Sequence, residues 1–468
     1  MTLPDHPDKR SVAVIGAGAV GVCSALHLQR RGWRVTLIDR EGPGSQTSFG
    51  NAGVISEGSL VPLNNPDLHA GLLGLLRNDS AALRYRPRHL LRHAGWVLAF
   101  LDASKTTRAR RHALALHTLT ARALDEHRAL MQRSGNAQRF SATGWLKAYR
   151  HGGAARAHDV LAGFTGEMLR RCEIEHRVLD AAALQALEPA LHPVFGAGVH
   201  LVSGGVIDSP GELVAEHAAR FAADGGELVR HEVRAIAEDG HGVRLDGTAG
   251  AHRYARVLIA AGPWSPDVLS LAGFDARMIV ERGYHAHYEA GPGAALGHSV
   301  HDVDGGYVVG PMAGSLRVTT GVELAPRDAP SDTAQLDQIE PRLREALSVG
   351  ARTARPVWRG ARPSFPDGCP AIGPLPGSRR VWVNAGHQHI GLMSAPVTGR
   401  LVAEMIGGET PVVDPHPFRP ERWIRRRRAD HGGRFRGRRL GAGQGAGKGT
   451  GKGTGKGAGK GAGGDRGA

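Results

Sequence analysis

Cysteine is scarce in this chain, and long apolar runs are missing from it. Its 468 residues include three cysteines, Cys23, Cys172 and Cys369, which stand far apart and form no C-x-x-C pair. This count and spacing exclude a disulfide framework and a cysteine-rich metal site. No apolar run reaches the roughly 18 residues that a membrane-spanning helix needs, and the polar first residues predict no secretory signal peptide. We therefore expect a cytoplasmic protein without a metal ion.

Acidic residues are in the minority, and the basic excess lies at the C-terminal end. The formal net charge is +15, but residues 424–468 alone carry 13 Lys and Arg against 2 Asp and Glu. This segment accounts for +11, which leaves +4 for residues 1–423 and gives no reason to expect specific nucleic-acid binding. The segment opens with RRRR (425–428) and continues as glycine–lysine repeats, a composition that predicts disorder. It is either an electrostatic handle for anionic lipid or nucleic acid, or an extension without function.

The rest of the chain alternates between strand and helix patterns. Residues 11–40 read as a buried strand, a glycine-rich turn, a helix that ends at Gly32, and a second strand. The stretch 278–325 alternates in polarity between glycine turns, as antiparallel sheets do. Residues 381–408 repeat the order of strand, glycine-rich turn and helix. Pieces typical of nucleotide binding are thus separated by other material, which favours a composite fold over two independent domains.

The turn after the first strand, GAGAVG (16–21), fits the pattern G-x-G-x-x-G. Gly16 permits the tight turn, Gly18 lets the backbone approach a pyrophosphate, and Gly21 lets helix and strand pack closely. Asp39, at the end of the second strand, has the spacing of an acid that binds a ribose hydroxyl group. The unit therefore predicts a dinucleotide site, which both NAD and FAD would satisfy.

A run of small and polar residues, QTSFGNAGVI (46–55), follows where an ordinary α/β domain begins its next helix. Together with the fingerprint before it, this run resembles the D-amino-acid oxidase superfamily of FAD enzymes. More narrowly, the chain is similar to the bacterial D-amino-acid dehydrogenase branch, including its D-hydroxyproline dehydrogenase-like members. Further matching stretches follow in the family's order and extend the resemblance over residues 11–423: RVLIAAGPWS (256–265), ERGYHAHY (281–288), LRVTTGVEL (316–324), RGARPSFPDGCPAIGP (359–374) and NAGHQHIGLMSAPVTG (384–399).

The resemblance implies an α/β, or composite α+β, fold. A Rossmann-like FAD-binding domain would be interleaved with an antiparallel-sheet substrate domain, and a disordered basic tail would follow. The expected limits are 11–85, 150–275 and 355–423 for the FAD-binding domain, 86–149 for a helical insertion, 276–354 for the substrate-binding region and 424–468 for the tail.

For the cofactor, the resemblance implies contacts along the whole length of FAD. The arm 46–55 would pass the pyrophosphate and the isoalloxazine ring, where Gly50 and Gly53 let the backbone run close to a flat ring. Covalent relatives carry a cysteine in the stretch matching 359–365, which this chain lacks, so non-covalent FAD is favoured. The implied residues are Gly16, Gly18, Val20, Gly21, Asp39, Arg40 and Val233 for the ADP half; Thr47, Ser48, Asn51, Ala52 and Gly53 in the arm; Ala261, Gly262 and Trp264 around the cofactor; and Gly386, His387, Ile390, Gly391 and Met393 at the pyrimidine end of the flavin.

Arg362, in the family's RP motif, is the implied ligand of the substrate carboxylate, because a planar guanidinium pairs with it in a bidentate manner. The alternative is a structural arginine that caps a strand. Tyr284, His285 and Tyr307 come from the substrate sheet and would line the pocket, although aromatic residues on a sheet are often core. At the position of His389 some oxidases of the superfamily carry a second carboxylate ligand, an arginine. A histidine there weakens the case for glycine specificity and leaves room for a bulkier or cyclic substrate.

The implied reaction is the oxidative deamination of a D-amino acid, with D-proline and hydroxy-D-proline among the expected substrates. Hydride would pass from Cα to flavin N5, and the imine would be hydrolysed to a 2-oxo acid and ammonia. Electrons would go to a quinone or another electron-transfer partner; the alternative is a glycine or sarcosine oxidase that uses O₂. The stretch HLLRHAGWVLAFLDA (89–103) is either a packed helix or, with the basic tail, a peripheral contact with the inner face of the cell membrane. An NAD-linked dehydrogenase is the alternative from another class.

Overall fold

In the computed structural model, which describes residues 7–67, 78–150 and 153–427, the N-terminal segment forms β1 (Ser11–Ile15), α1 (Ala19–Arg30) and β2 (Arg34–Asp39). This order confirms the strand, helix and strand predicted for residues 11–40. Gly32 follows the helix with a φ of 76°, and its N–H donates to the carbonyl of Gln29 at 3.0 Å. A left-handed glycine therefore ends α1 and turns the chain into β2.

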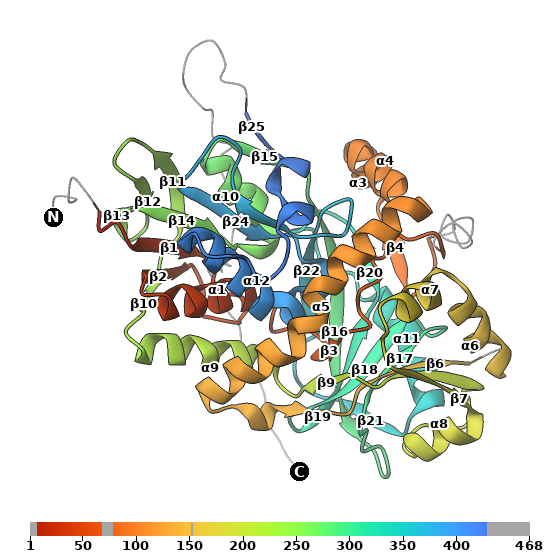
Figure 1. Ribbon diagram of the computed structural model, residues 1–468. Coiled ribbons are helices and arrows are strands. Elements are labelled where there is room, and N and C mark those ends of the chain that lie inside the picture. Colours follow the sequence, from red (N-terminus) through yellow and green to blue (C-terminus); the bar gives the residue numbers. More distant parts are fainter. Residues whose placement is uncertain (1–6, 68–77, 151–152, 428–468) are drawn as a thin grey trace, which may run out of the picture. The chain divides into compact units, whose positions relative to one another are not determined.

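Strands β1 and β2 belong to a six-stranded sheet that is assembled from distant parts of the chain (Figure 1). Five strands are parallel, and β23 lies antiparallel at one edge. Strands β1 and β24 are buried along their whole length, which matches their mainly apolar sequences. In order across the sheet, the strands are β10 (Glu227–Arg230), β2, β1, β14 (Arg256–Ile259), β24 (Val381–Ala385) and β23 (Ala371–Pro374).

Two apolar cores cover the two faces of this sheet, because neighbouring residues of a strand point to opposite sides. Val12 and Val14 pack with one group of helices, whereas Ala13 and Ile15 pack with a small antiparallel sheet and one helix. In Figure 1, helix α5 runs across α12 on the first of these faces. The first face carries α1, α5 (Thr106–Ser134), α9 (Pro210–Ala223) and α12 (Gly391–Gly407); the second carries β11 (Val233–Glu238), β12 (Val243–Gly247), β13 (Gly250–Tyr254) and α10 (Ser265–Leu271).

Helix α12 contains a proline, and a histidine of α5 compensates for it. Pro396 has no N–H, so the carbonyl of Leu392 lacks the partner that it would have one turn later in the helix. The Nε2–H of His127 donates to this carbonyl and to that of Met393, at 3.1 Å each. Burial lowers the pKa of His127 to about 4, so its ring is neutral. This contact fixes α5 against the glycine-rich turn that opens α12.

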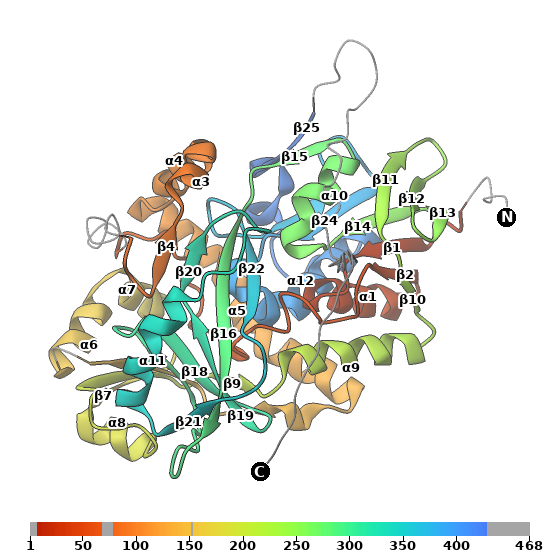
Figure 2. The ribbon, with the colours of Figure 1, turned by 180° about the vertical axis from the view of Figure 1, so that it is seen from behind.

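A larger, mostly antiparallel sheet contains the segment 278–325, as the sequence predicts (Figure 2). Its central strand β16 (Ile279–Ala290) pairs with β19 (Ser315–Thr320) and with β22 (Trp358–Ser364). Helix α11 (Ala334–Ala346) packs on the face that carries the even-numbered tyrosines of β16. The odd-numbered residues of β16 therefore face the other way, toward the segment 46–55. The other strands of this sheet are β4 (Leu83–Tyr85), β20 (Val322–Leu324), β18 (Tyr307–Met312), β17 (Ser299–Asp302), β6 (Trp145–Tyr149), β8 (Ala197–Leu201), β7 (His176–Asp180) and β21 (Val349–Arg352).

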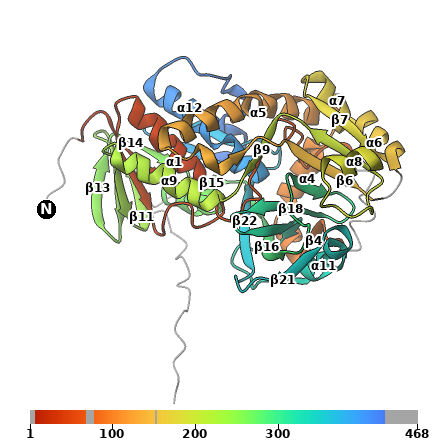
Figure 3. The same ribbon diagram turned by 90° about the horizontal axis from the view of Figure 1, so that it is seen from below.

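Short elements complete the body of residues 7–427. Three strands form a small sheet, and three helices gather beside β6 and β7, as Figure 3 shows. The small sheet joins the end of the arm 46–55 to the segment near residue 205. The strands are β3 (Val54–Ser56), β9 (Gly204–Ile207) and β5 (Phe140–Ser141), and the helices are α6 (Gly153–Ala162), α7 (Phe164–Arg171) and α8 (Ala181–Leu187).

Two expectations about single segments need correction. The stretch 89–103 is not one helix, because α3 (Pro87–Arg92) ends at His93 and α4 (Ala94–Ala103) begins directly after it. The tail is not disordered from residue 424 onward, because β25 (Ile424–Arg426) pairs antiparallel with β15 (Phe274–Ala276). Ile424 is fully buried in this pairing. Burial of its apolar side chain stabilises the strand, although arginines follow it in the sequence. The tail from residue 428 lies outside the described residues.

Sheet pairing also differs from the expected segment limits. Strands β7 and β8 lie within 150–275, expected for the FAD-binding domain, yet they pair with β6 in the larger sheet. Strand β22 lies within 355–423 and pairs with β16 in that sheet. A short strand does not specify its partner, because the partner is chosen by contacts far along the chain. The division into domains stays a prediction.

Candidate active site

The turn between β1 and α1 places its three glycines in different environments. Gly16 has a φ of +112°, and a side chain there would overlap the carbonyl of Ala260 on the neighbouring strand. A side chain on Gly21 would overlap the carbonyl of Gly16. At Gly18, the only atom within 4 Å of an added Cβ is the Oγ of Ser48, at 3.4 Å. Packing requires the first and third glycines, and the second leaves its backbone accessible to a ligand.

The N-terminus of α1 is well suited to an anion. The first turn of α1, which includes Val20, has no acidic residue. The N-cap residue, Gly18, has no side chain with which to cap the helix. The Oγ of Ser48 accepts the N–H of Ala19 at 2.9 Å, and the Oδ2 of Asp39 accepts the N–H of Ala17 at 2.6 Å. Burial raises the pKa of Asp39 although its hydrogen bonds oppose the rise. The remaining N–H groups and the positive end of the helix dipole match a pyrophosphate.

Ala261, Gly262 and Trp264 follow β14 beside the same turn. Gly262 has a φ of +52°, and no atom lies within 4 Å of the place where its Cβ would be. The guanidinium of Arg40 lies over the ring of Trp264, with 4.5 Å between Cζ and the ring centroid. These residues thus line open space at the carboxyl ends of β1, β2 and β14, the edge where open α/β sheets bind ligands.

Val233 approaches this edge from the small antiparallel sheet. It begins β11, two residues after His231, whose N–H donates to the carbonyl of Asp39 at 2.7 Å. Val233 itself is buried against the second face of the parallel sheet. The structure therefore brings it near the predicted ribose-binding acid.

The arm 46–55 is held by the larger sheet through main-chain contacts. Arg317, buried on β19, donates from Nη1 to the carbonyls of Phe49 at 2.9 Å and Asn51 at 2.7 Å. The hydroxyl of Thr47 donates to the carbonyl of Ala361 on β22 at 2.9 Å. Burial lowers the pKa of Arg317 to about 10, and no carboxylate pairs with it among the described residues. The arm's carbonyl groups therefore take the place of a counter-ion for this guanidinium.

The glycines of the arm make room for protein groups. An added Cβ on Gly50 would overlap the indole ring of Trp358, and one on Gly53 would overlap the carbonyl of Ile207. Gly53 also has a φ of +78°, and its N–H donates to the Oδ1 of Asn51 at 2.8 Å. The flat ring beside Gly50 is thus a side chain of β22, which the sequence motif alone did not indicate.

The second glycine-rich turn joins β24 to α12. Gly386 has a φ of +88°, and a side chain there would overlap the ring of Phe365. The Nε2 of His387 lies 3.1 Å from the hydroxyl of Thr398, inside α12, and burial lowers the pKa of His387 to about 3. His387 is therefore a neutral, buried residue that supports the turn through its contact with Thr398 of α12.

Helix α12 begins at Gly391, between the buried side chains of Ile390 and Met393. Its first turn has no acidic residue, as in α1. Helices α1 and α12 follow parallel strands of one sheet, so both N-termini lie at the same edge. Two positive helix ends at one edge fit a long anionic cofactor such as FAD, whose pyrophosphate and reduced flavin both carry negative charge.

Arg362 lies on β22, directly opposite Glu281 of β16. Its guanidinium lies across Gly283, where an added Cβ would be 2.6 Å from Nη1. Nη1 donates to the carbonyl of Gly321 at 3.1 Å, and Nη2 to that of Thr320 at 3.5 Å. Burial lowers the pKa of Arg362 and Glu281 opposes this, but no carboxylate forms an ion pair with it within the described ranges. A partly buried guanidinium without an ion-pair partner can bind a ligand carboxylate.

The carboxylate of Glu281 and the imidazole of His389 are in contact beside Arg362, and the sequence motifs did not indicate Glu281. Its Oε2 lies 3.0 Å from the Nε2 of His389; the glutamate side chain is 2% exposed and the histidine 36%. Burial raises the pKa of Glu281, but His389 and, to a smaller extent, Ser364 and Arg362 bring it below its usual value. The stretch ERGYHAHY could have indicated Glu281, because residues 281 and 285 are four apart on one strand and therefore share a sheet face.

His285 belongs to an aromatic cluster on the same face. Its ring stacks on that of Trp358, with centroids 5.0 Å apart and an interplanar angle of 17°, and lies 5.8 Å from the ring of Phe49. Burial lowers the pKa of His285 to about 3, so the ring is neutral. The cluster gives the site an apolar wall between the arm and β22.

Tyr284 and Tyr307 lie on the opposite face of the larger sheet, in the core under α11. The Tyr284 hydroxyl donates to the Oε2 of Glu323 at 2.7 Å. Burial raises the pKa of Tyr307 far above its usual range. Since neighbours on a strand face opposite ways, Tyr284 and His285 do not line one pocket. The structure does not bring the two tyrosines together with Arg362.

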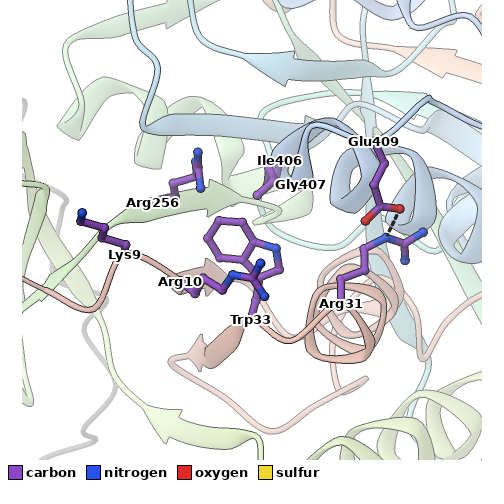
Figure 4. Close-up of a pocket in the computed structure, with 8 residues that line it drawn as sticks. All are labelled: Lys9, Arg10, Arg31, Trp33, Arg256, Ile406, Gly407 and Glu409. Atoms are coloured by element: carbon purple, nitrogen blue, oxygen red, sulfur yellow. Dashed lines mark hydrogen bonds and ion pairs between the residues drawn. The ribbon is translucent and has the colours of Figure 1, made fainter.

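A separate surface hollow of about 260 Å³ lies near the other edge of the parallel sheet (Figure 4). Arg10 and Arg256 stand there, where β1 and β14 begin. Arg31 pairs with Glu409 at 3.0 Å, and the guanidinium of Arg256 lies 4.7 Å from the ring centroid of Trp33. The hollow lies beside the C-terminal ends of α1 and α12, whose negative dipoles favour these cations. It is remote from the edge that carries the glycine-rich turns.

Metal ligation and membrane spanning find no support in the part of the chain that the structure describes. No group of three or more His, Cys, Asp and Glu side chains there is arranged to hold a metal ion. No helix within the same ranges is long and apolar enough to cross a bilayer. The three cysteines are unpaired.

Known proteins match this chain over most of its length. A family model described as FAD dependent oxidoreductase, DAO, matches residues 11–405. A D-amino-acid oxidase of Bradyrhizobium diazoefficiens is 31% identical over 429 residues, which cover 89% of this chain and 100% of that protein. D-amino acid dehydrogenase 2 of Pseudomonas aeruginosa is 34% identical over 415 residues, which cover 86% and 96%.

Solved structures share the fold at lower identity. A glycine oxidase of Geobacillus kaustophilus has a TM-score of 0.67 at 22% identity and covers 87% of this chain and 97% of its own. An L-proline dehydrogenase of P. horikoshii has a TM-score of 0.67 at 19% identity, with coverages of 89% and 98%. The family model and the relatives both extend over the fingerprint, the arm and the second glycine-rich turn. This chain belongs to the DAO family of FAD-dependent oxidoreductases, and its cofactor is FAD.

Proposed function

We propose that this FAD-dependent amino-acid oxidoreductase deaminates D-amino acids, D-proline and hydroxy-D-proline among them, and passes their electrons to a quinone or another carrier. The observation that carries the proposal is Arg362, a partly buried guanidinium without a carboxylate partner in the described part of the chain. It lies on the sheet face that meets the arm 46–55. The names of the curated relatives, a D-amino-acid oxidase and D-amino acid dehydrogenases, support this substrate class.

The proposed cofactor contacts follow the open edge of the parallel sheet. Non-covalent binding is proposed because residues 359–365 contain no cysteine. Gly18 and Gly262 would offer backbone that has free space beside it, and the N-termini of α1 and α12 would supply unpaired N–H groups. The residues proposed to hold FAD are Gly16, Gly18, Val20, Gly21, Asp39, Arg40, Thr47, Ser48, Asn51, Ala52, Gly53, Val233, Ala261, Gly262, Trp264, Gly386, His387, Ile390, Gly391 and Met393.

In the proposed mechanism, the protein contributes mainly by positioning the substrate. Arg362 would bind the substrate carboxylate with two parallel hydrogen bonds, which fixes the orientation of Cα–H and the amine. His285 and Trp358 would exclude water from one side of the substrate, since both are packed and His285 is neutral. Bound FAD would supply the acceptor for the Cα hydride, so that the amine would become an imine. Water would hydrolyse the imine of a primary amino acid to a 2-oxo acid and ammonia, whereas a cyclic amine such as D-proline would leave a cyclic imine. No strong general base is required if the amine reacts in its neutral form.

The decisive test is anaerobic reduction of the bound flavin by a panel of amines. Purified holoprotein would be mixed with D- and L-amino acids, D-proline, hydroxyprolines, glycine and sarcosine, and flavin bleaching would be followed in the visible range. We expect bleaching by D-amino acids and reoxidation by a quinone analogue faster than by O₂. Bleaching by glycine and sarcosine with rapid reoxidation by O₂ would favour the oxidase alternative, and an amine panel without effect would refute the proposal.

Peripheral membrane contact is part of the proposal, and the surface of α3 and α4 supports it. Leu91 is 77% exposed and Leu98 is 68% exposed, with the cations Arg88 and Arg92 nearby. Trp96 of α4 donates from Nε1 to the carbonyl of Ser364 at 3.1 Å, which joins this surface to β22. Apolar tips with a cationic rim suit an anionic lipid surface, from which a quinone would reach the enzyme.

Vesicle sedimentation tests this contact. We expect binding to vesicles with anionic lipid and release by salt, and weaker binding when Leu91 and Leu98 are both changed to Ser. Val178 and Leu228 are the matched control, because they are also exposed apolar residues but lie elsewhere. Equal binding of the two double variants would remove α3 and α4 from the proposal.

A further inference from the structure

Glu281 is a buried carboxylate that lies opposite Arg362 and in contact with the imidazole of His389. The pairing register places it directly opposite Arg362, and its Oε2 lies 3.0 Å from the Nε2 of His389. Its side chain is 2% exposed, so water does little to stabilise its charge. The pKa of Glu281 is nevertheless lowered; burial opposes this, and His389 is the largest favourable influence. The carboxylate is therefore ionised while the site holds no substrate.

His389 is held beside Glu281 by a constrained backbone. It lies in a single 3₁₀ turn, and the preceding residue Gln388 has a φ of +47°, which is unfavourable for a residue with a side chain. A backbone bridge between Ser364 and His387 ties this turn to the end of β22. The position of the imidazole is thus fixed relative to both Glu281 and Arg362.

Several titratable groups near this pair, within the described residues, have a lowered pKa or partners of their own. On the same sheet face, His285 has its pKa lowered to about 3, and His387, behind the turn, to about 3 as well. Arg317 on β19 donates from Nη1 to the arm and from Nε to His287. In the loop after β22, Asp367 pairs with Arg422 at 3.1 Å. The other acid of this region, Glu323, pairs with Arg282 at 3.1 Å on the opposite face.

The charges of the site change when a carboxylate enters. Before binding, the charges of Arg362 and Glu281 sum to zero although the two side chains form no ion pair, and the imidazole of His389 is the neighbouring side chain that can carry one more positive charge. A bound substrate carboxylate would place a second negative charge in the same buried region. With a neutral imidazole, one guanidinium would face two carboxylates, which is costly in a region of low dielectric constant. With an imidazolium, two cations face two anions.

We propose that Glu281 makes His389 take up one proton when a substrate carboxylate binds to Arg362, so that the two carboxylates are held by two cations. Glu281 is a positioning residue in this scheme, because it acts on the substrate through His389. The inference rests on the proposed function, in that the ligand of Arg362 is taken to be a carboxylate. It makes substrate binding dependent on pH through a residue pair that the arginine-containing oxidases of the superfamily would not need.

The test uses acetate, a carboxylate without an amine to oxidise, and the FAD-loaded protein. Its dissociation constant is measured from the visible spectrum of the flavin between about pH 6 and about pH 9. In the pH range in which His389 is neutral before acetate binds, we expect the dissociation constant of acetate to rise about tenfold per unit increase in pH, because binding is linked to the uptake of one proton. In weakly buffered solution at about pH 8, saturating acetate should raise the pH by the equivalent of one proton per flavin, with sodium chloride as the reference titration.

Three variants separate the proposed role from a merely structural one. Glu281→Gln keeps the shape but removes the negative charge, so acetate should bind without proton uptake and, at high pH, more tightly than to the unchanged protein. His389→Gln should also bind without proton uptake, but weakly at every pH. Glu289→Gln is the matched control, since Glu289 lies on the same strand β16 and is exposed; it should behave like the unchanged protein.

Each outcome decides the question. Acetate binding without proton uptake in the unchanged protein would overturn the inference and leave the proposed function standing. The same uptake in Glu281→Gln would overturn the role of Glu281. If acetate leaves the flavin spectrum unchanged and no amine bleaches it, the proposed function fails together with the inference. Should Glu281→Gln not fold, proton uptake by the unchanged protein and by His389→Gln still decides.

Discussion

The guanidinium of Arg362 donates to two backbone carbonyls, and its remaining N–H groups can bind a ligand. In Arg362→Lys the charge remains but the bidentate geometry is lost. Because a hydrogen bond to a charged group contributes about 1.5–3 kcal/mol, we expect the dissociation constant of the substrate to rise by about ten- to a hundredfold. FAD content should not change. Anaerobic titration of the flavin with substrate measures this.

The control for that substitution lies three residues earlier on the same strand. Arg359 faces the opposite side of β22 and donates to the carbonyl of Ala329. Arg359→Lys should leave substrate affinity within about twofold, since surface changes of this kind have small effects. Similar losses in both variants would indicate general damage to the strand and would contradict a specific role for Arg362.

For single residues, the sequence predicted the types of the site residues better than the sheet face on which each side chain lies. The RP motif led to Arg362, and the structure places it, partly buried, opposite Glu281. Tyr284 and His285 were predicted together, yet strand alternation sends them to opposite faces. The strand itself was predicted, but the face that looks toward the arm depends on which elements cover the sheet. Arg317 and Trp358 were missed for the same reason, because their partners lie in the arm, far away in sequence.

The arm 46–55 has little regular structure, so its order depends on the side chains that hold it. Arg317→Met would leave the carbonyls of Phe49 and Asn51 without their donor. Ordering even one backbone residue costs about 1–2 kcal/mol, so we expect FAD affinity to fall by at least about tenfold. Fluorescence of released FAD measures the loss. Arg352→Met is the control, because Arg352 lies on β21 and pairs with Glu340 of α11, away from the arm. An equal loss of FAD affinity in this variant would contradict the role of Arg317.

Helix α12 supplies the second glycine-rich turn, and its proline makes it dependent on α5. His127→Leu leaves the carbonyl of Leu392 buried and unpaired, which should lower the free energy of unfolding by about 1–3 kcal/mol. Pro396→Ala restores the helical N–H that this carbonyl lacks. In the Pro396→Ala background, His127→Leu should therefore cost less, by about 1 kcal/mol. Thermal unfolding of the four proteins gives the coupling, and additive effects would refute the compensation.

Elements with a strong local signal were predicted well, and those defined by distant partners were not. The unit 11–40 and the turn before α12 follow from glycine spacing and apolar runs, and both formed as expected. Strand β25 was taken for the start of a disordered tail because four arginines follow Ile424. Its partner β15 lies about 150 residues earlier, where nothing in the local sequence announces the pairing.

On the scale of the whole molecule, the composite fold was predicted because its pieces recur in the order of a known family. The two sheets exchange segments several times along the chain, which composition and periodicity do not reveal. Side chains are buried where these segments pack between sheets and helices, and many of the 25 histidines are among the buried residues. Burial lowers the pKa of His27 and His301 to about 3, and that of His127 and His217 to about 4.

These buried histidines make the stability of the whole molecule dependent on pH. Their pKa is about 6.5 in the unfolded chain, so between about pH 6.5 and about pH 4 the unfolded state binds more protons than the folded state. Their contribution to stability is complete above about pH 6.5 and is lost as the pH falls. Each adds a slope of up to about 1.4 kcal/mol per pH unit in this window, so the thermal midpoint should be much lower at about pH 5 than at about pH 7.5.

The origin of this slope is tested by removing one buried histidine at a time. His217 accepts or donates one hydrogen bond through Nδ1, to the Oγ of Ser134 at 2.8 Å, which an amide can replace. His217→Gln cannot be protonated in this range, so its thermal midpoint should change less between the two pH values. His158→Gln, at an exposed position, should keep the original pH dependence. Because both variants lose one histidine, parallel curves for all three proteins would place the acid sensitivity in the carboxylates that pair with arginine, whose protonation also favours unfolding.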